Sequence, residues 1–158
     1  MKDENNNSNA ALIIREMTED DLPRIMELEH DIFPDPWPES AFLEQIYGDG
    51  WGGLVAASDG RVIGYGCYLW AGGEAHLTNL CVDSGFRRKS VARALMRRIF
   101  EFVRKQQCES MILEVRPSNQ EAIAFYLSLG FEHLYRRPAY YRTPTEDALV
   151  MRLNIERG

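Results

Sequence analysis

The spacing of apolar residues along the chain predicts an ordered series of strands and helices. Short apolar or alternating stretches predict strands over residues 12–15, 54–57, 62–69, 74–82, 111–115, 131–137 and 148–153. Apolar residues three and four positions apart predict helices over residues 18–29, 40–47 and 90–105. Because a helix connects the strands over residues 74–82 and 111–115, these two strands should run parallel in one sheet. We therefore predict a mixed α/β (α+β) fold with a central, mostly antiparallel sheet and flanking helices.

A further helix begins after residue 118, and local signals mark both of its ends. Ser118 and Glu121 have the spacing of a capping box, and Gly130 supplies the left-handed stop. Tyr126 lies on the apolar face of this helix. Taken alone, Tyr126 is better explained as a core aromatic than as a functional phenol.

The strand over residues 111–115 is apolar except for Glu114. A carboxylate rarely lies in a core strand without an ionic partner or a chemical role. The structural explanation is an ion pair with Arg116 or Arg142, and from this strand alone it is as good as the functional one. Because only a short turn separates the strand from the next helix, we expect Glu114, Asn119 and Tyr126 to border one cleft. An acid, an amide and a phenol at that place would suit proton transfer.

The turn before the long helix holds three consecutive cations, Arg87, Arg88 and Lys89. Backbone N–H groups at a helix N-terminus favour anions, and cations there oppose the helix dipole unless an anion binds. The sequence therefore indicates a phosphate site. A solvated basic cluster explains the same residues and, on spacing alone, is the more common case.

The bulk composition is that of an ordinary globular protein. The chain has 158 residues, 45% hydrophobic residues and a formal net charge of −6, which predicts one domain over residues 11–158 after a disordered tail over residues 1–10. The acidic balance argues against a nucleic-acid partner. We expect a cytoplasmic protein without a membrane partner, because the start of the chain lacks a signal core and no apolar run could span a bilayer.

The cysteines and histidines do not indicate a metal site. The three cysteines are Cys67, Cys81 and Cys108, and the three histidines are His30, His76 and His133. Neither set has zinc-ligand or redox-pair spacing, so we expect buried thiols and no metal. Cys81 could be imagined as an acyl carrier, but it lies in an apolar strand without a histidine to activate it.

Five segments resemble the GNAT superfamily of acetyl-CoA-dependent N-acetyltransferases, and more narrowly the bacterial ribosomal-protein alanine N-acetyltransferases. They are FPDPW at residues 33–37, LEVRPSN at 113–119, AIAFYLSLGF at 122–131, RRPAYY at 136–141 and EDALVM at 146–151. The resemblance covers nearly the whole chain after the tail. The superfamily's loop signature, R/Q-x-x-G-x-G/A, falls on residues 87–92, with Ser90 in place of the first glycine.

The resemblance implies a fold whose parallel strands splay apart to admit acetyl-CoA. The residues that match cofactor-binding positions are Leu80, Cys81, Val82, Arg87, Arg88, Lys89, Ser90, Val91, Ala92, Arg93 and Asn119. Glu114 matches the general base and Tyr126 the general acid. If the backbone at Ser90 is helical, serine fits the loop; if the site needs a positive φ, cofactor affinity should suffer.

The activity implied by the resemblance is acetyl transfer to a protein N-terminus, most of all the N-terminal alanine of a small-subunit ribosomal protein. The alternatives are acetylation of a lysine or a small amine, and a non-catalytic acyl-CoA-binding module. Tyr140 and Tyr141 could form the wall of a peptide groove or simply cover the sheet. Trp37 could line the acceptor site, although we favour an anchoring role. The oligomeric state is left open.

Overall fold

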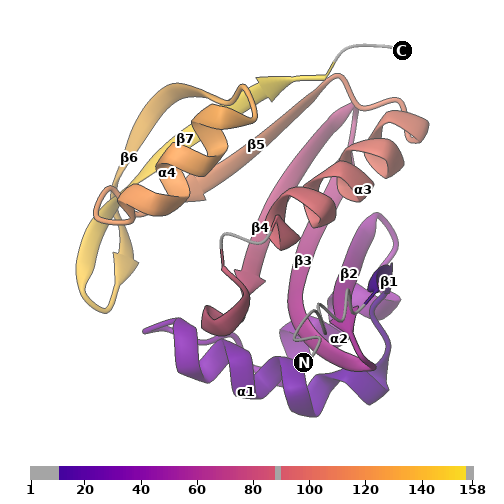
Figure 1. Cartoon of the computed structure of the whole chain (residues 1–158). Coiled ribbons are helices and arrows are strands. Elements are labelled where there is room, and N and C mark those ends of the chain that lie inside the picture. Colours follow the sequence, from indigo (N-terminus) through magenta and orange to yellow (C-terminus); the bar gives the residue numbers. More distant parts are fainter. Residues whose placement is uncertain (1–10, 88–89, 156–158) are drawn as a thin grey trace, which may run out of the picture.

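The computed structural model describes residues 11–87 and 90–155, so the predicted tail lies outside the described residues. Seven strands form one sheet in the order β1-β2-β3-β4-β5-β7-β6 (Figure 1). The strands are β1 (Leu12–Glu16), β2 (Trp51–Ser58), β3 (Arg61–Ala71), β4 (Glu74–Val82), β5 (Ser110–Val115), β6 (Glu132–Arg142) and β7 (Thr145–Asn154). The helices are η1 (Glu19–Asp21), α1 (Leu22–Ile32), α2 (Glu39–Tyr47), η2 (Ser84–Phe86), α3 (Val91–Lys105) and α4 (Gln120–Ser128). The mixed sheet is confirmed: β4 and β5 pair in parallel, and the other pairs in the described chain are antiparallel.

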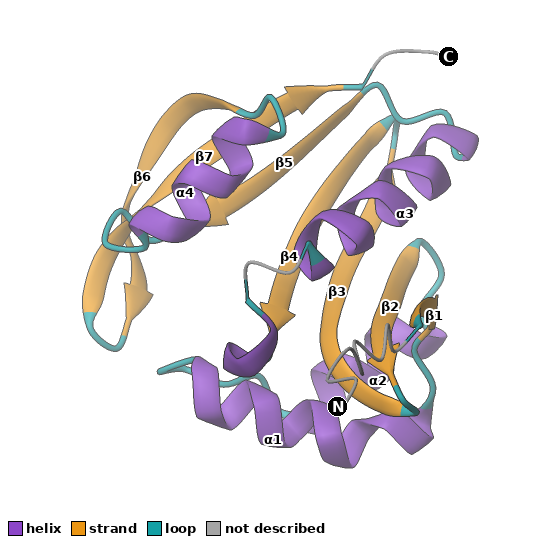
Figure 2. Ribbon diagram, viewed as in Figure 1, coloured by secondary structure: helices purple, strands orange, loops and turns teal. Residues whose placement is uncertain are grey.

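Helices cover both faces of the sheet (Figure 2). Adjacent residues of β2 show this, because Leu54 packs in the core beneath α3 and α4 whereas Val55 packs in the core beneath α1 and α2. Successive side chains of a strand point to opposite faces, so a sheet covered on both sides carries two cores. Ile99 of α3 and Phe42 of α2 are fully buried in the first and second core, respectively. None of the helices in the described ranges is long and apolar enough to cross a membrane.

The parallel strands β4 and β5 stay paired over only part of their length. Glu74 to Leu77 of β4 face Ser110 to Leu113 of β5, and beyond these residues the strands diverge (Figure 1). The β3–β4 ladder is irregular at the same level, because Tyr68 pairs with Leu77 whereas the preceding Cys67 pairs with Asn79. An extra residue in one strand increases the local bend. The irregular pairing thus bends β4 where it separates from β5, and this bend in the backbone accounts for the splayed strands.

Local signals set most element boundaries, with one correction at α4. The residue that caps α4 is Asn119, whose Oδ1 accepts from the Ala122 N–H at 3.1 Å, so the predicted Ser118–Glu121 capping box is wrong. The Ser118 hydroxyl instead donates to Glu146 of β7 at 2.7 Å. Gly130 ends the helix region with a φ of 100°, as predicted.

The last two strands are longer than their hydrophobic patterns predicted. β6 continues to Arg142 and β7 begins at Thr145, so the two form a long hairpin whose tip lies near the α1–α2 segment (Figure 1). Most of β6 is exposed, and an exposed strand lacks the apolar alternation that marks its extent in a sequence.

Candidate active site

A cleft of about 360 Å³ opens beside the end of β4, between the starts of α3 and α4. The predicted cofactor-binding residues that line it are Leu80, Cys81, Val82, Arg87, Ser90, Val91, Ala92, Arg93 and Asn119. Arg88 and Lys89 lie outside the described residues. Tyr126 lines the cleft as well, together with Phe86 and Phe125, which the sequence analysis did not single out. Segments far apart in the chain thus meet at one concave surface of ordinary ligand-site size.

The backbone of the last β4 residues is available to a ligand on one side. Leu80, Cys81 and Val82 pair with β3, while the β4–β5 ladder ends at Leu77. Strand groups facing such a gap can pair with an extended amide-containing chain, as an added strand would. The Arg87 and Arg93 side chains and the α3 N-terminus border the same cleft and favour an anion. The cleft therefore suits an extended ligand with a negatively charged end.

Ser90 has the left-handed backbone conformation, which decides between the two alternatives for this residue. Its φ is 67° and its ψ is 15°, and it lies at the N-cap of α3 without a side-chain capping bond. This conformation costs an L-residue about 1–2 kcal/mol, whereas glycine adopts it freely. The chain thus has serine where the local backbone favours glycine.

Tyr126 combines a buried ring with a place in the cleft wall. The side chain is 8% exposed, and its ring packs edge-on against Phe131 with centroids 5.7 Å apart. Burial raises the pKa of the Tyr126 phenol, so the hydroxyl stays protonated at neutral pH. Tyr126 is thus a core aromatic that also lines the cleft, so the structural explanation is compatible with the predicted role as a proton donor.

Glu114 does not line this cleft, so the expectation that it borders one cleft with Asn119 and Tyr126 is wrong in that form. Its strand neighbours Leu113 and Val115 are buried beneath α3 and α4. The carboxylate therefore projects from the opposite face of the sheet, where β4 and β5 diverge. An extended ligand that passes between the strands would have the carboxylate on one face and the phenol on the other.

The partners of Glu114 are not the arginines named from the sequence. Its Oε2 lies 2.5 Å from Nε2 of His76 on β4, and its Oε1 lies 3.5 Å from the guanidinium of Arg137 on β6. The Glu114 side chain is 9% exposed, whereas that of His76 is 26% exposed. An ion-pair environment is thus present, but it is built from neighbouring strands and not from Arg116 or Arg142.

Tyr140 and Tyr141 lie on β6 near Glu114. Their rings meet edge-on with centroids 5.0 Å apart, and Tyr140 is 44% exposed. Burial raises the pKa of Tyr141, and interactions with Tyr140 and Glu114 raise it further. The role of the two tyrosines as an acceptor wall stays a prediction.

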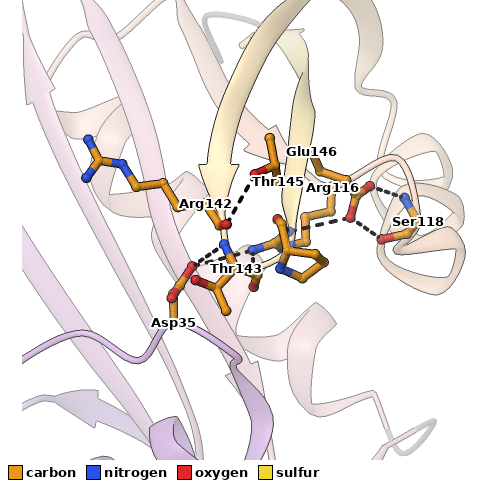
Figure 3. Close-up of polar contacts among 8 residues, drawn as sticks. Asp35, Arg116, Ser118, Arg142, Thr143, Thr145 and Glu146 are labelled. Atoms are coloured by element: carbon orange, nitrogen blue, oxygen red, sulfur yellow. Dashed lines mark hydrogen bonds and ion pairs between the residues drawn. The ribbon is translucent and has the colours of Figure 1, made fainter.

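A polar clasp joins the tip of the β6–β7 hairpin to the α1–α2 segment (Figure 3). Asp35 accepts a hydrogen bond from the Thr143 N–H at 3.1 Å and lies 3.7 Å from the Arg116 guanidinium. Arg116 also donates to the Pro144 and Thr143 carbonyls, at 2.8 and 3.1 Å, and lies 3.5 Å from Glu146. The clasp thus joins the α1–α2 segment, the end of β5 and the hairpin tip.

Glu29 of α1 holds the α1–α2 segment at Trp37. This 1% exposed carboxylate accepts from the Trp37 N–H at 2.9 Å, the Tyr65 hydroxyl at 2.6 Å and the Asn79 side chain at 2.9 Å. The Trp37 ring packs against Phe42 at 5.4 Å. These contacts support the anchoring role of Trp37, because its backbone and its ring are both held by the core.

The cysteines are buried and free within the described chain. Burial is the main cause that raises the pKa of the Cys81 thiol to about 12. Since the thiolate is the nucleophilic form, Cys81 is a poor acyl carrier at neutral pH. Within residues 11–87 and 90–155, no three His, Cys, Asp or Glu side chains are grouped as metal ligands.

Sequence reasoning missed His76, Arg137 and Glu29. His76 and Arg137 contact Glu114 because of how the strands pair, which the sequence of one strand does not show. Glu29 is a charged residue on α1, whose sequence pattern indicates only an apolar face. One signal was present: strand alternation over residues 111–115 already places Glu114 opposite Leu113 and Val115.

Comparisons with known proteins agree with this geometry. The model of the Acetyltransferase (GNAT) family matches residues 22–131. Over 137 residues the chain is 33% identical to the ribosomal protein bS18-alanine N-acetyltransferase of Escherichia coli, covering 85% of this chain and 92% of that protein. Over 142 residues it is 32% identical to the N-alpha-acetyltransferase RimI of Mycobacterium tuberculosis, covering 86% and 88%. The crystal structure of the ribosomal-protein-S18-alanine N-acetyltransferase from Escherichia coli has a TM-score of 0.84, at 30% identity over 93% of this chain and 96% of that one. The chain therefore belongs to the GNAT family of acetyltransferases.

Proposed function

We propose that this acetyltransferase moves an acetyl group from acetyl-CoA to the N-terminal α-amine of a protein, and that its acceptor is the N-terminal alanine of the ribosomal protein S18. The name of the relative from Escherichia coli supports this acceptor, and the name of the relative from Mycobacterium tuberculosis supports transfer to an α-amine. The observation that carries the proposal is the placement of a carboxylate and a phenol on opposite faces of the sheet, on either side of the gap between β4 and β5.

In this proposal acetyl-CoA is a substrate held by the cleft. The pantetheine arm pairs with the backbone of Leu80 to Val82, and the diphosphate lies at the α3 N-terminus near Arg87 and Arg93. Asn119 caps α4 through its oxygen, which leaves its side-chain nitrogen as a donor to the cofactor.

The proposed chemistry is direct attack by the amine. An α-amino group has a pKa of about 7.7–8.0, so at neutral pH much of it must first lose a proton. Glu114 is the base, directly or through a water molecule, and a backbone N–H of the β4 end polarises the thioester carbonyl. Tyr126 donates a proton to the departing thiolate from the other side of the gap. No covalent enzyme intermediate is needed, because holding both substrates in place supplies much of the acceleration.

A thiol-release assay with matched acceptors tests the proposal. The acceptors are a short peptide that begins with alanine, the same peptide with a blocked N-terminus and an internal lysine, and a polyamine. We expect turnover with the first peptide alone. Turnover of the blocked peptide or of the polyamine would establish lysine or small-amine acetylation instead. Tight CoA binding without turnover of any amine would indicate a binding module, which the left-handed Ser90 makes worth testing.

A further inference from the structure

His76 contacts Glu114, the proposed base, and has no role in the chemistry proposed so far. It lies on β4 with its strand neighbours Ala75 and Leu77 buried beneath α3 and α4, so its ring projects from the same face as Glu114. The contact between Nε2 and the Glu114 Oε2 is 2.5 Å long. It joins β4, one residue before the last ladder position, to β5, one residue beyond that position.

The reaction under "Proposed function" releases more than one proton from the acceptor. Between the ammonium and the amide the nitrogen loses two protons, while the departing thiolate gains one. One proton per turnover must therefore leave the site. A single carboxylate holds one proton at a time, and Glu114 is only 9% exposed, so it exchanges poorly with bulk water. A group that passes the proton from Glu114 to solvent would restore the base.

We infer that His76 is the proton-relay partner of Glu114 and connects the buried carboxyl to solvent; this inference rests on the proposed function. A proton leaves the amine nitrogen for the Glu114 carboxylate. It then passes from Oε2 to Nε2 of an imidazole that carries its hydrogen on Nδ1. The ring, 26% exposed, releases the Nδ1 proton to water, and a tautomer shift frees Nε2 for the next turnover. The carboxylate is regenerated, and no oxidant or further reactant is required.

The other described groups around Glu114 are poorly suited to this role. Arg137 lies 3.5 Å from Oε1, but a guanidinium stays protonated and cannot accept a proton. Tyr140 and Tyr141 are phenols whose pKa is raised by burial. Imidazole ordinarily gains and loses a proton within the physiological pH range. His76 is thus the contacting group that can both accept and release one.

The alternative is that His76 merely holds the carboxylate in place, and two substitutions separate the roles. His76→Gln keeps an N–H donor near the position of Nε2 but cannot accept a proton. His76→Ala leaves a partly solvent-exposed space that imidazole can occupy. Arg137→Gln is the comparison that removes the other contact to Glu114. His133→Gln, on the exposed part of β6, is the control for loss of a histidine outside the site.

The experiment measures kcat and the KM for the amine in the full-length protein, with CoA affinity and thermal unfolding as checks on folding. We expect His76→Gln to lower kcat by about 10²-fold, the low end for a positioned proton-transfer group, with CoA affinity unchanged. Imidazole should restore the rate of His76→Ala in a saturable way and should not restore that of Arg137→Gln.

Two results would overturn the inference: a His76→Gln rate within about twofold of the wild type, or a slow His76→Ala protein that imidazole does not accelerate. Rates are measured with whichever of the three acceptors the wild-type protein acetylates. A wrong acceptor therefore refutes the proposed function and leaves this test intact.

Discussion

Replacing Ser90 with glycine should stabilise the protein, because the residue has a φ of 67°. The left-handed conformation costs serine about 1–2 kcal/mol. Glycine removes that cost but gives the unfolded chain more freedom, which opposes folding by about 0.4–1 kcal/mol. The serine side chain makes no capping bond that would be lost. At the middle of both ranges the net gain is about 0.8 kcal/mol, and since 1 kcal/mol corresponds to about 2–4 °C for a chain of this size, Tm should rise by about 2–3 °C.

Ser90→Ala is the matched control, because alanine also lacks the hydroxyl but keeps the Cβ atom. Thermal unfolding followed by circular dichroism should show a higher Tm for Ser90→Gly and no increase for Ser90→Ala. Calorimetry with CoA then reports on the ligand. Tighter binding by Ser90→Gly alone means that the Cβ atom hinders the diphosphate, and equally weaker binding by both variants means that the hydroxyl donates to it. A Tm for Ser90→Gly at or below that of the wild type would refute the strain argument, as would an equal rise for Ser90→Ala.

Three further predictions concern the site and the stability of the fold. Glu114→Gln should lower kcat by about 10²–10⁴-fold with little change in CoA affinity, since the carboxylate lies on the face opposite the cleft; steady-state kinetics would remove it from the chemistry if the rate were unchanged. Tyr126→Phe should slow turnover by about the same factor at unchanged Tm, and full activity at saturating substrates would show that water can supply the proton. Asp21→Asn should lower the free energy of unfolding by about 1–3 kcal/mol at pH 7, because the buried carboxylate accepts two bonds of 2.8 Å from Arg15 and one from the Thr18 N–H. Burial opposes ionisation of Asp21, but these hydrogen bonds outweigh it and lower the Asp21 pKa. A group with a lowered pKa stabilises the fold above the pKa of the unfolded chain, about 3.9, and loses this effect as pH falls through the folded value. The difference between the two proteins in urea unfolding should thus shrink below about pH 4, and a difference independent of pH would contradict this assignment.

Much of the fold and the grouping of residues around the cleft could be predicted because their signals are local. The strand–helix–strand connection implies the parallel pair, Gly130 marks the end of the α4 region, and the motif around Ser90 indicates the turn that borders the cleft. Each depends on residues close together in the chain. The contacts that were predicted wrongly are those between segments far apart in the chain.

Two examples show why such contacts could not be read from one sequence. Ser118 has the spacing of a capping box, but Glu146 of β7 takes its hydroxyl, and Asn119 caps the helix instead. Glu114 meets His76 and Arg137 because β5 lies between β4 and β7 and the β6–β7 hairpin curves back toward it. Strand register follows from packing and loop length, and neither is encoded in the segment that carries the acid.

The short parallel joint also has a mechanical consequence. β4 and β5 share four ladder positions, whereas β3 and β4 share eight, so the sheet resembles two leaves on a narrow hinge. The Asp35 clasp joins the α1–α2 segment to the tip of the β6–β7 hairpin, and so links the two parts of the sheet. An extended thioester lying along Leu80 to Val82 would fill the gap between the diverging strands and would restrict their movement relative to each other. Amide hydrogens of these residues should then exchange with solvent more slowly once CoA is bound. This part of the sheet would thus be more rigid in the complex than in the free protein.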